Sequence, residues 1–510
     1  MLSIRKYSYL ILFAVLVLLV GSLWAFGGSK GENSLGDADP WVSRAADLDA
    51  LKALQSPEES GQETGALPRE ADPPGNEGDS GSPAHPLQPG KAADASDSHP
   101  TKNQTDPPQE EAMTMDEKDF LAEQEDHAPQ TGRYAHSENK SRQTAQSLQG
   151  ELRGIWIPFM SLTTPEKTEA AFCANFREIA DRSKAAGMNA LFVHVRPYGD
   201  ALYPSSYFPW SHILTGVQGE DPGFDPLRFM LDYSHGLGMD FHAWINPLRV
   251  KSLESPDSLS ADNPYNALKD DNPYYFLTDD SGIYLNPAHQ YIRGLIAKGA
   301  AEIAQNYDVD GIHFDDYFYP SEAPGPDADS YEAYCAQTPQ PLPLSDWRSA
   351  NISAMVAEVY QAVKQVNPAL PFGISPGGNL DNNQKIGADV LSWCKVPGYV
   401  DYICPQLYYS YDNKALGYQD ALEAWLALPR HKELSLYIGL GLYKAGSDAD
   451  EGTWLTDDNL LARQLADARQ GQTQGFILYS YDFLGIPETE KELAQFLLEM
   501  ENPGADGNTP

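Results

Sequence analysis

The sequence predicts an α/β protein whose main domain, residues 149–500, is a (β/α)8 TIM barrel. Between Glu151 and Met500, eight short β-type runs alternate with helical stretches in about 350 residues, the order and size that such a barrel requires. Polar and aromatic residues also collect at the carboxyl ends of the runs, where barrel enzymes carry their sites. A doubly wound open sheet is the alternative, but it does not need eight units, and no Gly-x-Gly-x-x-Gly sequence follows a strand.

The predicted strands are LRGIWIPF (152–159), ALFVHVRP (190–197), DFHAWINP (240–247), GIHFDD (311–316), PFGIS (371–375), YICPQLYY (402–409), LYIGLGLY (436–443) and GFILYSY (475–481). The predicted helices are residues 167–186, 225–237, 290–306, 346–366, 385–393, 419–428, 459–470 and 488–499. Helix starts are marked by Thr164-Pro165-Glu166 and by Asp225-Pro226, since Pro is favoured in the first turn of a helix.

Residues 1–27 form a predicted signal peptide or signal-anchor. Arg5 and Lys6 precede an apolar run, LILFAVLVLLVGSLWAF, from Leu10 to Phe26. A run of this length behind a basic start is typical of a secretory signal or a short membrane anchor. The basic residues before the run predict that the rest of the chain lies outside the cytoplasm. We therefore expect an extracytoplasmic protein of the cell envelope, either anchored by this segment or secreted after its cleavage, with no other contact to the cell membrane.

Residues 28–148 are rich in Pro, Gly, Ser and acids, as in SPEESGQETGALPREADPPGNEGDSGSPAHPLQPG. Such a segment buries too little apolar surface to offset the entropy of folding. It therefore predicts a disordered acidic linker, and residues 501–510 a disordered tail. The net charge of −38 argues against nucleic acid as a partner, because nucleic-acid binding requires basic patches.

The four cysteines, Cys173, Cys335, Cys394 and Cys404, lie far apart and lack Cys-x-x-Cys spacing. We therefore expect no zinc site, no other metal and no cofactor, while a disulfide among them stays open. The sequence shows no Ser-His-Asp arrangement with elbow spacing and no phosphate loop, which disfavours an esterase or a kinase. We expect a monomer.

The candidate catalytic residues are Asp315 and Asp316, within DGIHFDDYFYP (310–320). Two like charges at the end of a buried strand are costly unless they share a proton or a task. The substrate-binding candidates lie at predicted strand ends or in the loops that follow. They are Arg196, Tyr198, Asp200, Tyr203, Trp244, Asn246, Arg249, His313, Tyr317, Gln406, Tyr408 and Tyr479. Flat rings stack on sugar faces, and amides and guanidinium groups hold hydroxyls, so these residues together predict a carbohydrate site.

Each binding candidate also has a structural interpretation. The Tyr and Trp side chains are explained equally by packing at the rim of the barrel. Arg196 is a candidate partner of Asp200 or Asp315, and His313 alternates with Ile312 and Phe314 as a satisfied residue of the barrel interior would.

Seven stretches of the chain resemble glycosyl hydrolase-like family ten, TIM-barrel glycosidases of the bacterial envelope, and they occur in the order of that family. They are ELRGIWIP (151–158), HVRPYGDALYPSSYFPWS (194–211), AWINPLRV (243–250), YLNPAHQYIR (284–293), DGIHFDDYFYP (310–320), ISPGGN (374–379) and PQLYYS (405–410). The resemblance implies a glycoside hydrolase whose partner is a polysaccharide, with peptidoglycan strands that lack stem peptides as the expected substrate. The acidic linker is not part of the resemblance.

Several mechanisms stay open. The segment is similar to hexosaminidases that use the acetamido group of the substrate, which implies that Asp315 orients that group and Asp316 is the general acid. It departs from the chitinase pattern, since His313 replaces an Asp and Tyr317 stands in place of the acidic Glu. In the alternative, Asp315 is a covalent nucleophile and a second acid comes from another loop. Candidates for that acid are Asp200, Asp412 and Asp482, and an inverting reaction is not excluded either.

The main hypothesis is thus an enzyme that hydrolyses glycosidic bonds in N-acetylated cell-wall glycan. One alternative is a barrel without catalysis that binds wall polysaccharide through its Tyr and Trp side chains. Another is a hydrolase of a different exopolysaccharide. The intact pair of acids favours an enzyme, because a protein that only binds would be free to lose it.

Overall fold

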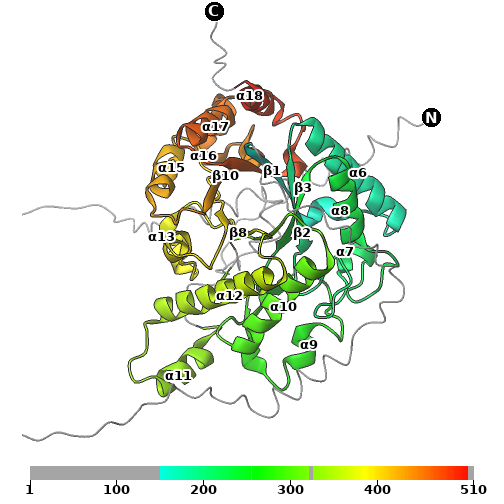
Figure 1. The fold of residues 1–510 in the computed structure, drawn as a ribbon, viewed down its shortest axis with the longest axis vertical. Coiled ribbons are helices and arrows are strands. Elements are labelled where there is room, and N and C mark those ends of the chain that lie inside the picture. Colours follow the sequence, from blue (N-terminus) through cyan, green and yellow to red (C-terminus); the bar gives the residue numbers. More distant parts are fainter. Residues whose placement is uncertain (1–149, 254, 317, 321–324, 503–510) are drawn as a thin grey trace, which may run out of the picture. The chain divides into compact units, whose positions relative to one another are not determined.

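The computed structural model describes residues 150–253, 255–316, 318–320 and 325–502 (Figure 1). The predicted signal segment and acidic linker, the residues after 502, and Tyr317 lie outside the described residues. Among the residues that are described, none of the helices combines the length and the apolar character that crossing a membrane would need.

Eight parallel strands form a closed barrel, so the predicted (β/α)8 fold is confirmed. The strands follow one another around the barrel in the order β1-β11-β10-β9-β8-β7-β3-β2. Their bounds are β1 (Leu152–Ile157), β2 (Ala190–Arg196), β3 (Asp240–Ile245), β7 (Gly311–Phe314), β8 (Phe372–Ile374), β9 (Tyr402–Ile403), β10 (Ser435–Gly441) and β11 (Gly475–Tyr479). Each predicted run matches one of these strands, although β10 begins one residue before its run, and the last residues of most runs leave the sheet to line the mouth of the barrel.

Helices surround the barrel (Figure 1). The longer ones are α6 (Glu169–Ala185), α8 (Pro226–Gly236), α10 (Gln290–Asn306), α11 (Ala328–Gln337), α12 (Leu344–Val366), α15 (Tyr418–Ala427), α17 (Leu460–Gln470) and α18 (Glu490–Glu501). The shorter ones are α5 (Phe159–Leu162), α7 (His212–Thr215), α9 (Pro264–Leu268), α13 (Leu380–Lys385), α14 (Val390–Lys395) and α16 (Ala449–Thr456). The single helix predicted over 385–393 is wrong. Gly387 adopts a left-handed φ of 79° and ends α13, and the Asp389 side chain caps the start of α14.

A small antiparallel sheet lies between β3 and α10 and was not predicted. Its order is β4-β6-β5, formed by β4 (Arg249–Ser252), β5 (Phe276–Asp279) and β6 (Gly282–Leu285). The sheet follows the carboxyl end of β3 and therefore stands on the side of the barrel where chemistry is expected.

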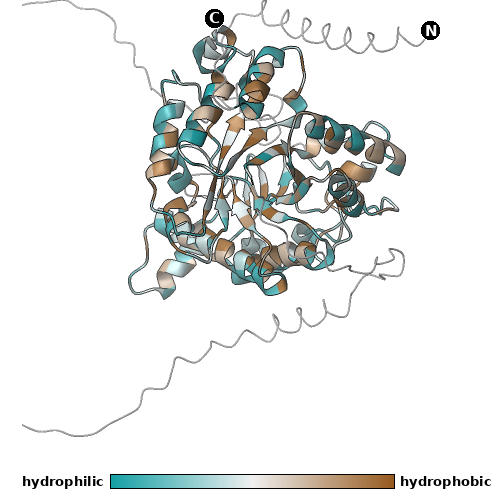
Figure 2. Ribbon diagram, turned by 45° about the horizontal axis from the view of Figure 1, so that its top comes forward, coloured by the Kyte–Doolittle hydropathy of each residue, from teal (hydrophilic) through white to brown (hydrophobic). Residues whose placement is uncertain are grey.

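In Figure 2 the barrel strands carry mainly hydrophobic residues, whereas the helices show bands of both kinds. Glycine makes room inside the barrel for larger rings. A β-carbon on Gly311 would lie 2.1 Å from the His242 ring, and one on Gly373 would lie 2.2 Å from the Tyr402 ring. Real β-carbons do not approach other atoms so closely, so these two strand positions require glycine because of packing rather than backbone angle.

A polar network crosses the barrel interior around His313. Trp156 donates its indole N–H to His313 Nε2 at 3.1 Å, and His313 Nδ1 lies 3.0 Å from the Tyr402 hydroxyl. His242 Nδ1 is 3.3 Å from the same hydroxyl. Burial lowers the pKa of His313 well below its usual value and that of His242 to about 4, so both rings are neutral. A neutral histidine ring can be buried at low cost when one ring nitrogen accepts a hydrogen bond and the other donates one, as in His313.

Glu492 on α18 caps the start of α17 by accepting the backbone N–H of Leu461. Burial, and then the negative charges of Asp457 and Asp458, raise the pKa of Glu492 to about 7, above its usual 4.5. The folded state therefore binds a proton that the unfolded chain releases, so this carboxyl destabilises the fold progressively as pH rises from about 4.5 to about 7.

We expect Glu492→Gln, which keeps the accepting oxygen without the charge, to unfold like the wild type at pH 4. At pH 8 the variant should be more stable by on the order of 2 kcal/mol. Urea denaturation at both pH values checks this, with the exposed Glu490→Gln as the control. Equal stability of Glu492→Gln and wild type at pH 8 would contradict the assignment.

Candidate active site

Both candidate catalytic acids lie in the loop that follows β7, because the strand ends at Phe314. The carboxylate of Asp315 turns toward β3. Its Oδ2 accepts the indole N–H of Trp244 at 3.0 Å and the amide of Asn246 at 3.3 Å, and its Oδ1 lies 3.4 Å from the same amide. N–H donors on a carboxylate favour its charged form and hold it in one orientation. Asp315 is therefore a fixed acceptor.

Asp316 turns the other way, toward β8 and β9. A β-carbon on Gly377, in the turn after β8, would lie 4.0 Å from Asp316 Oδ2. Burial raises the pKa of Tyr408, after β9, well above its usual value, and the negative charge of Asp316 adds to that effect. Asp316 is 9% exposed and Asp315 is 3% exposed. The two neighbours thus occupy different surroundings, the arrangement that separates the roles of two acids.

An aromatic wall stands at the mouth beside Asp316. We define it as Tyr408, Tyr443 and Tyr479, which follow or end β9, β10 and β11. The three ring centroids lie 5.6 to 5.8 Å apart, and the Trp156 ring lies 6.0 Å from that of Tyr479. Tyr408 and Tyr443 are buried and Tyr479 is partly exposed, so Tyr479 is the ring of the wall that can offer a face to a sugar.

Arg249 and Asn246 support Asp315. The backbone N–H of Arg249 donates to Asn246 Oδ1 at 3.0 Å, which orients the amide toward the carboxylate. The Arg249 guanidinium donates to the carbonyl of Pro197 at 2.8 and 3.0 Å and lies 4.4 Å from the Tyr198 ring centroid. Asn246 and Arg249 are almost fully buried. They are positioning residues rather than the direct substrate contacts that the sequence predicted.

The prediction that Arg196 binds substrate is wrong. A register shift between His194 and Arg196 sets two residues of β2 against one of β3, so Arg196 pairs with Ile245 and turns to the outer face of the barrel. There its guanidinium lies 4.2 Å from the ring centroid of Phe208, in contact range of Gly299 on α10.

Four further binding candidates also require correction, because 1% or less of each is exposed. Tyr203 packs against Tyr307 behind β2, and Tyr198 packs under Arg249. His313 lies in the barrel interior with both ring nitrogens hydrogen-bonded, as its structural interpretation predicted. Asp200 accepts His212 Nδ1 at 3.2 Å and Gln218 Nε2 at 3.0 Å in the loops outside β2.

The remaining binding candidates that the structure describes, which are Trp244, Gln406, Tyr408 and Tyr479, lie at or after the carboxyl ends of β3, β9 and β11. Gln406 is partly exposed and donates to the Ser375 carbonyl at 3.0 Å, in register with Gly377. Asp482, a candidate second acid, is exposed and accepts the Ser161 hydroxyl at 2.7 Å. Gln406, Asp482 and the aromatic wall thus lie at the carboxyl end of the barrel, as do Asp315 and Asp316.

Sequence reasoning missed His194 and Tyr443. The His194 ring stacks on Trp244 with centroids 3.9 Å apart and planes at 7°, so it fixes the indole that binds Asp315. Burial lowers the pKa of His194 well below its usual value, and the neutral ring adds no charge beside Arg249. The sequence did contain a signal for the inward position of His194. It stands two residues after Phe192, which faces inward, and side chains alternate along a strand.

The described part of the chain contains no group of three His, Cys, Asp or Glu side chains that could hold a metal ion. All four cysteines are free thiols, three of them buried.

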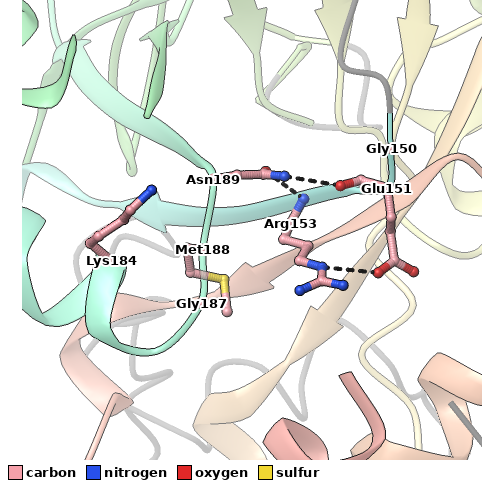
Figure 3. Close-up of a pocket in the computed structure, with 7 residues that line it drawn as sticks. All are labelled: Gly150, Glu151, Arg153, Lys184, Gly187, Met188 and Asn189. Carbon is pink, nitrogen blue, oxygen red and sulfur yellow. Dashed lines mark hydrogen bonds and ion pairs between the residues drawn. The ribbon is translucent and has the colours of Figure 1, made fainter. Parts of the chain in front are cut away.

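A cavity of about 300 Å³ lies at the other end of the barrel, at the start of β1 and β2 (Figure 3). The Asn189 side chain bridges the carbonyl of Glu151 and the N–H of Arg153 there, at 3.0 and 2.8 Å. Arg469 forms ion pairs with Glu151 and Glu499, at 2.7 and 3.0 Å, and so ties the last helix to the first strand. Residues at the amino-terminal face of such barrels serve stability, so we do not place the active site in this cavity.

We expect Trp244→Phe to lower the turnover of glycan about 10- to 100-fold with little change in KM. The substitution keeps a ring against His194 but removes the N–H that orients Asp315. Trp393→Phe is the matched control, because its indole N–H binds Ser353 between two outer helices at 3.0 Å. Steady-state kinetics on solubilised glycan strands measures both. Equal activities of the two variants would show that the Trp244 hydrogen bond does not serve the reaction.

Comparison with known proteins identifies the family of this chain. The model of the family described as glycosyl hydrolase-like 10 matches residues 151–456, more than half of the chain. Glycosyl hydrolase YngK of Bacillus subtilis (strain 168) is 35% identical over 344 residues, which cover 63% of this chain and 66% of YngK, just under two thirds of that relative. Glycosyl hydrolase DigH of Escherichia coli (strain K12) is 31% identical over 391 residues, covering 70% of this chain and 89% of DigH.

Among solved structures, α-L-fucosidase isoenzyme 2 from Paenibacillus thiaminolyticus is similar with a TM-score of 0.45 and 15% identity, covering 69% of this chain and 49% of that one. That likeness is too distant to bear on the reaction, and the family match and the two sequence relatives decide the assignment. The chain therefore belongs to the glycosyl hydrolase-like 10 family of glycoside hydrolases.

Proposed function

We propose that this glycoside hydrolase cleaves glycosidic bonds in N-acetylated cell-wall glycan, with peptidoglycan strands lacking stem peptides as its substrate. The observation that carries the proposal is the division of the two acids after β7. Asp315 is held by Trp244 and Asn246, while Asp316 stands beside the aromatic wall. A glycosidase needs one carboxylate fixed below the sugar and one acid near the leaving oxygen.

In the reaction that we propose, a sugar ring lies against Tyr479, with its anomeric carbon near the two acids. Asp316 donates a proton to the leaving glycosidic oxygen. Asp315, as a fixed anion, either orients the acetamido group of the substrate for attack on the anomeric carbon or attacks that carbon itself. The hydrogen bonds from Trp244 and Asn246 suit both versions, because each requires an ionised Asp315.

The test is digestion of sacculi from which an amidase has removed the stem peptides, followed by mass analysis of the soluble products. We expect peptide-free disaccharide units and short oligomers from the wild type. Tight binding of the glycan without any product would support the alternative of a polysaccharide-binding barrel. Release of sugars only from another exopolysaccharide would leave a glycosidase with a different substrate.

We also propose that the barrel acts outside the cytoplasmic membrane, tethered by residues 1–27 or secreted after their cleavage. The support is the basic start and apolar run of that segment. In intact cells expressing the full chain, we expect added protease to degrade the barrel once the wall has been removed. A barrel that survives until the membrane is also lysed would contradict this location.

A further inference from the structure

Asp200, His212 and Ser255 form a chain of hydrogen-bonded side chains at the rim of the barrel, separate from the acids after β7. Asp200 Oδ2 lies 3.2 Å from His212 Nδ1, and His212 Nε2 lies 2.9 Å from Ser255 Oγ. The three residues come from the loop after β2, the start of α7 and the loop after β4. Their order and spacing are those of an acid, a base and a nucleophile in hydrolytic enzymes.

The hydrogen bonds also determine which nitrogen of His212 carries the proton. A carboxylate only accepts, so Nδ1 donates to Asp200, and the lone pair of Nε2 faces the hydroxyl of Ser255. Gln218 donates a second N–H to Asp200 Oδ2 at 3.0 Å, and Gln218 Oε1 accepts from Asn263 at 3.1 Å. These hydrogen bonds hold the Asp200 carboxylate in one orientation, as the acid of such a chain requires.

Exposure to solvent increases from Asp200 through His212 to Ser255, which is the direction that catalysis requires. Asp200 is fully buried, 19% of the His212 side chain is exposed, and Ser255 is partly exposed. A nucleophile must be reached by its substrate, whereas the acid behind the base works best away from water. The Lys251 ammonium donates to the carbonyl of Pro256, in the turn that carries Ser255.

The buried side chains of Tyr198 and Arg249 lie between these three residues and the glycosidase site. The Tyr198 ring lies 5.5 Å from that of His212 and 4.4 Å from the Arg249 guanidinium carbon, and Arg249 orients Asn246 beside Asp315. We propose that Asp200, His212 and Ser255 form a second hydrolytic centre, which removes small O-acyl esters such as acetate from the glycan at the mouth. The identity of that glycan rests on the proposed function, whereas the ester chemistry rests on the geometry of these three residues.

The proposed reaction balances without a cofactor. Ser255 Oγ attacks the ester carbonyl carbon while His212 Nε2 takes the hydroxyl proton. The bond between the carbonyl carbon and the sugar oxygen then breaks, and His212 returns the proton to that oxygen, which leaves a sugar hydroxyl and an acyl-Ser255. Water attacks the acyl group with His212 as base, releases the carboxylic acid and restores Ser255.

A fluorophosphonate probe tests the nucleophile on the full chain. We expect the wild type to form an adduct that mass spectrometry maps to Ser255. The adduct should be absent from Ser255→Ala and unchanged in Ser258→Ala, an exposed serine of the same loop. Acetate release from O-acetylated, peptide-free glycan should fall at least about 100-fold in Ser255→Ala, while cleavage of the glycosidic bonds stays at the wild-type rate.

An unlabelled Ser255 in folded wild-type protein, or undiminished acetate release by Ser255→Ala, would overturn the proposal. The two readouts also separate it from the proposed function. Labelling and ester hydrolysis without cleavage of the glycan would support the second centre and contradict the glycosidase substrate. Cleavage of the glycan without labelling of Ser255 would support the glycosidase substrate and contradict the second centre.

Discussion

Asp316→Asn should lose about 10²- to 10⁴-fold in turnover on glycan strands but much less on an aryl glycoside of the same sugar. A sugar alkoxide leaves poorly without a proton, whereas a nitrophenolate leaves readily, so loss of the general acid penalises only the first substrate. Asp315→Asn should lose a similar factor on both substrates, because its role lies in the attack on the anomeric carbon. Kinetics on both substrates, with circular dichroism to confirm folding, provides the measurement.

Asp482→Asn is the matched control, since Asp482 is another acid at the mouth but is exposed and bonded to Ser161. We expect it to retain most of the activity. A loss as large as that of Asp316→Asn on glycan would instead make Asp482 the second acid, and full activity of both Asp315→Asn and Asp316→Asn would refute the catalytic pair.

Added azide separates the two roles of Asp315. If Asp315 is a covalent nucleophile, azide should rescue Asp315→Asn and give a glycosyl azide of inverted configuration. If Asp315 orients the acetamido group, wild-type activity should fall steeply when that group carries electron-withdrawing fluorines, because a weaker acetamido nucleophile attacks more slowly.

Gly373→Ala should lower the free energy of unfolding by about 3 kcal/mol, near the upper end for overpacking a core. The added methyl would lie 2.2 Å from the Tyr402 ring. That ring cannot step aside cheaply, because its hydroxyl is hydrogen-bonded to both His313 and His242 inside the barrel. Urea denaturation followed by tryptophan fluorescence measures the change.

Gly294→Ala is the control for the general effect of replacing glycine by alanine at a position without crowding. Gly294 lies within α10, and a β-carbon there meets nothing within 4 Å. We expect that variant to gain up to about 1 kcal/mol, since alanine favours helix more than glycine does. Unchanged stability of Gly373→Ala would mean that the interior network around Tyr402 repacks freely.

The sequence alone determined the barrel and the position of its acids. Eight β-type runs alternate with amphipathic helices, and that pattern persists in the fold because the hydrophobic periodicity of each segment favours one type of element. Parallel strands in a closed barrel bring their carboxyl ends to one mouth. Asp315 and Asp316 could therefore be placed there from their position at the end of the fourth run.

Side-chain direction was decided only by the tertiary structure. Alternation along β2 would have directed Arg196 inward with His194, but a shift of one residue against β3 turns it outward. The opposite orientations of Asp315 and Asp316 likewise depend on donors from β3 and on a turn after β8.

The chain of Asp200, His212 and Ser255 was invisible in the sequence for the same physical reason. No local spacing joins its members, and only the packing of two loops and the start of α7 brings their polar atoms within 3.2 Å. Local patterns determine which elements form, whereas contacts between residues distant in sequence determine which side chains meet, and the chemistry of this protein depends on the second.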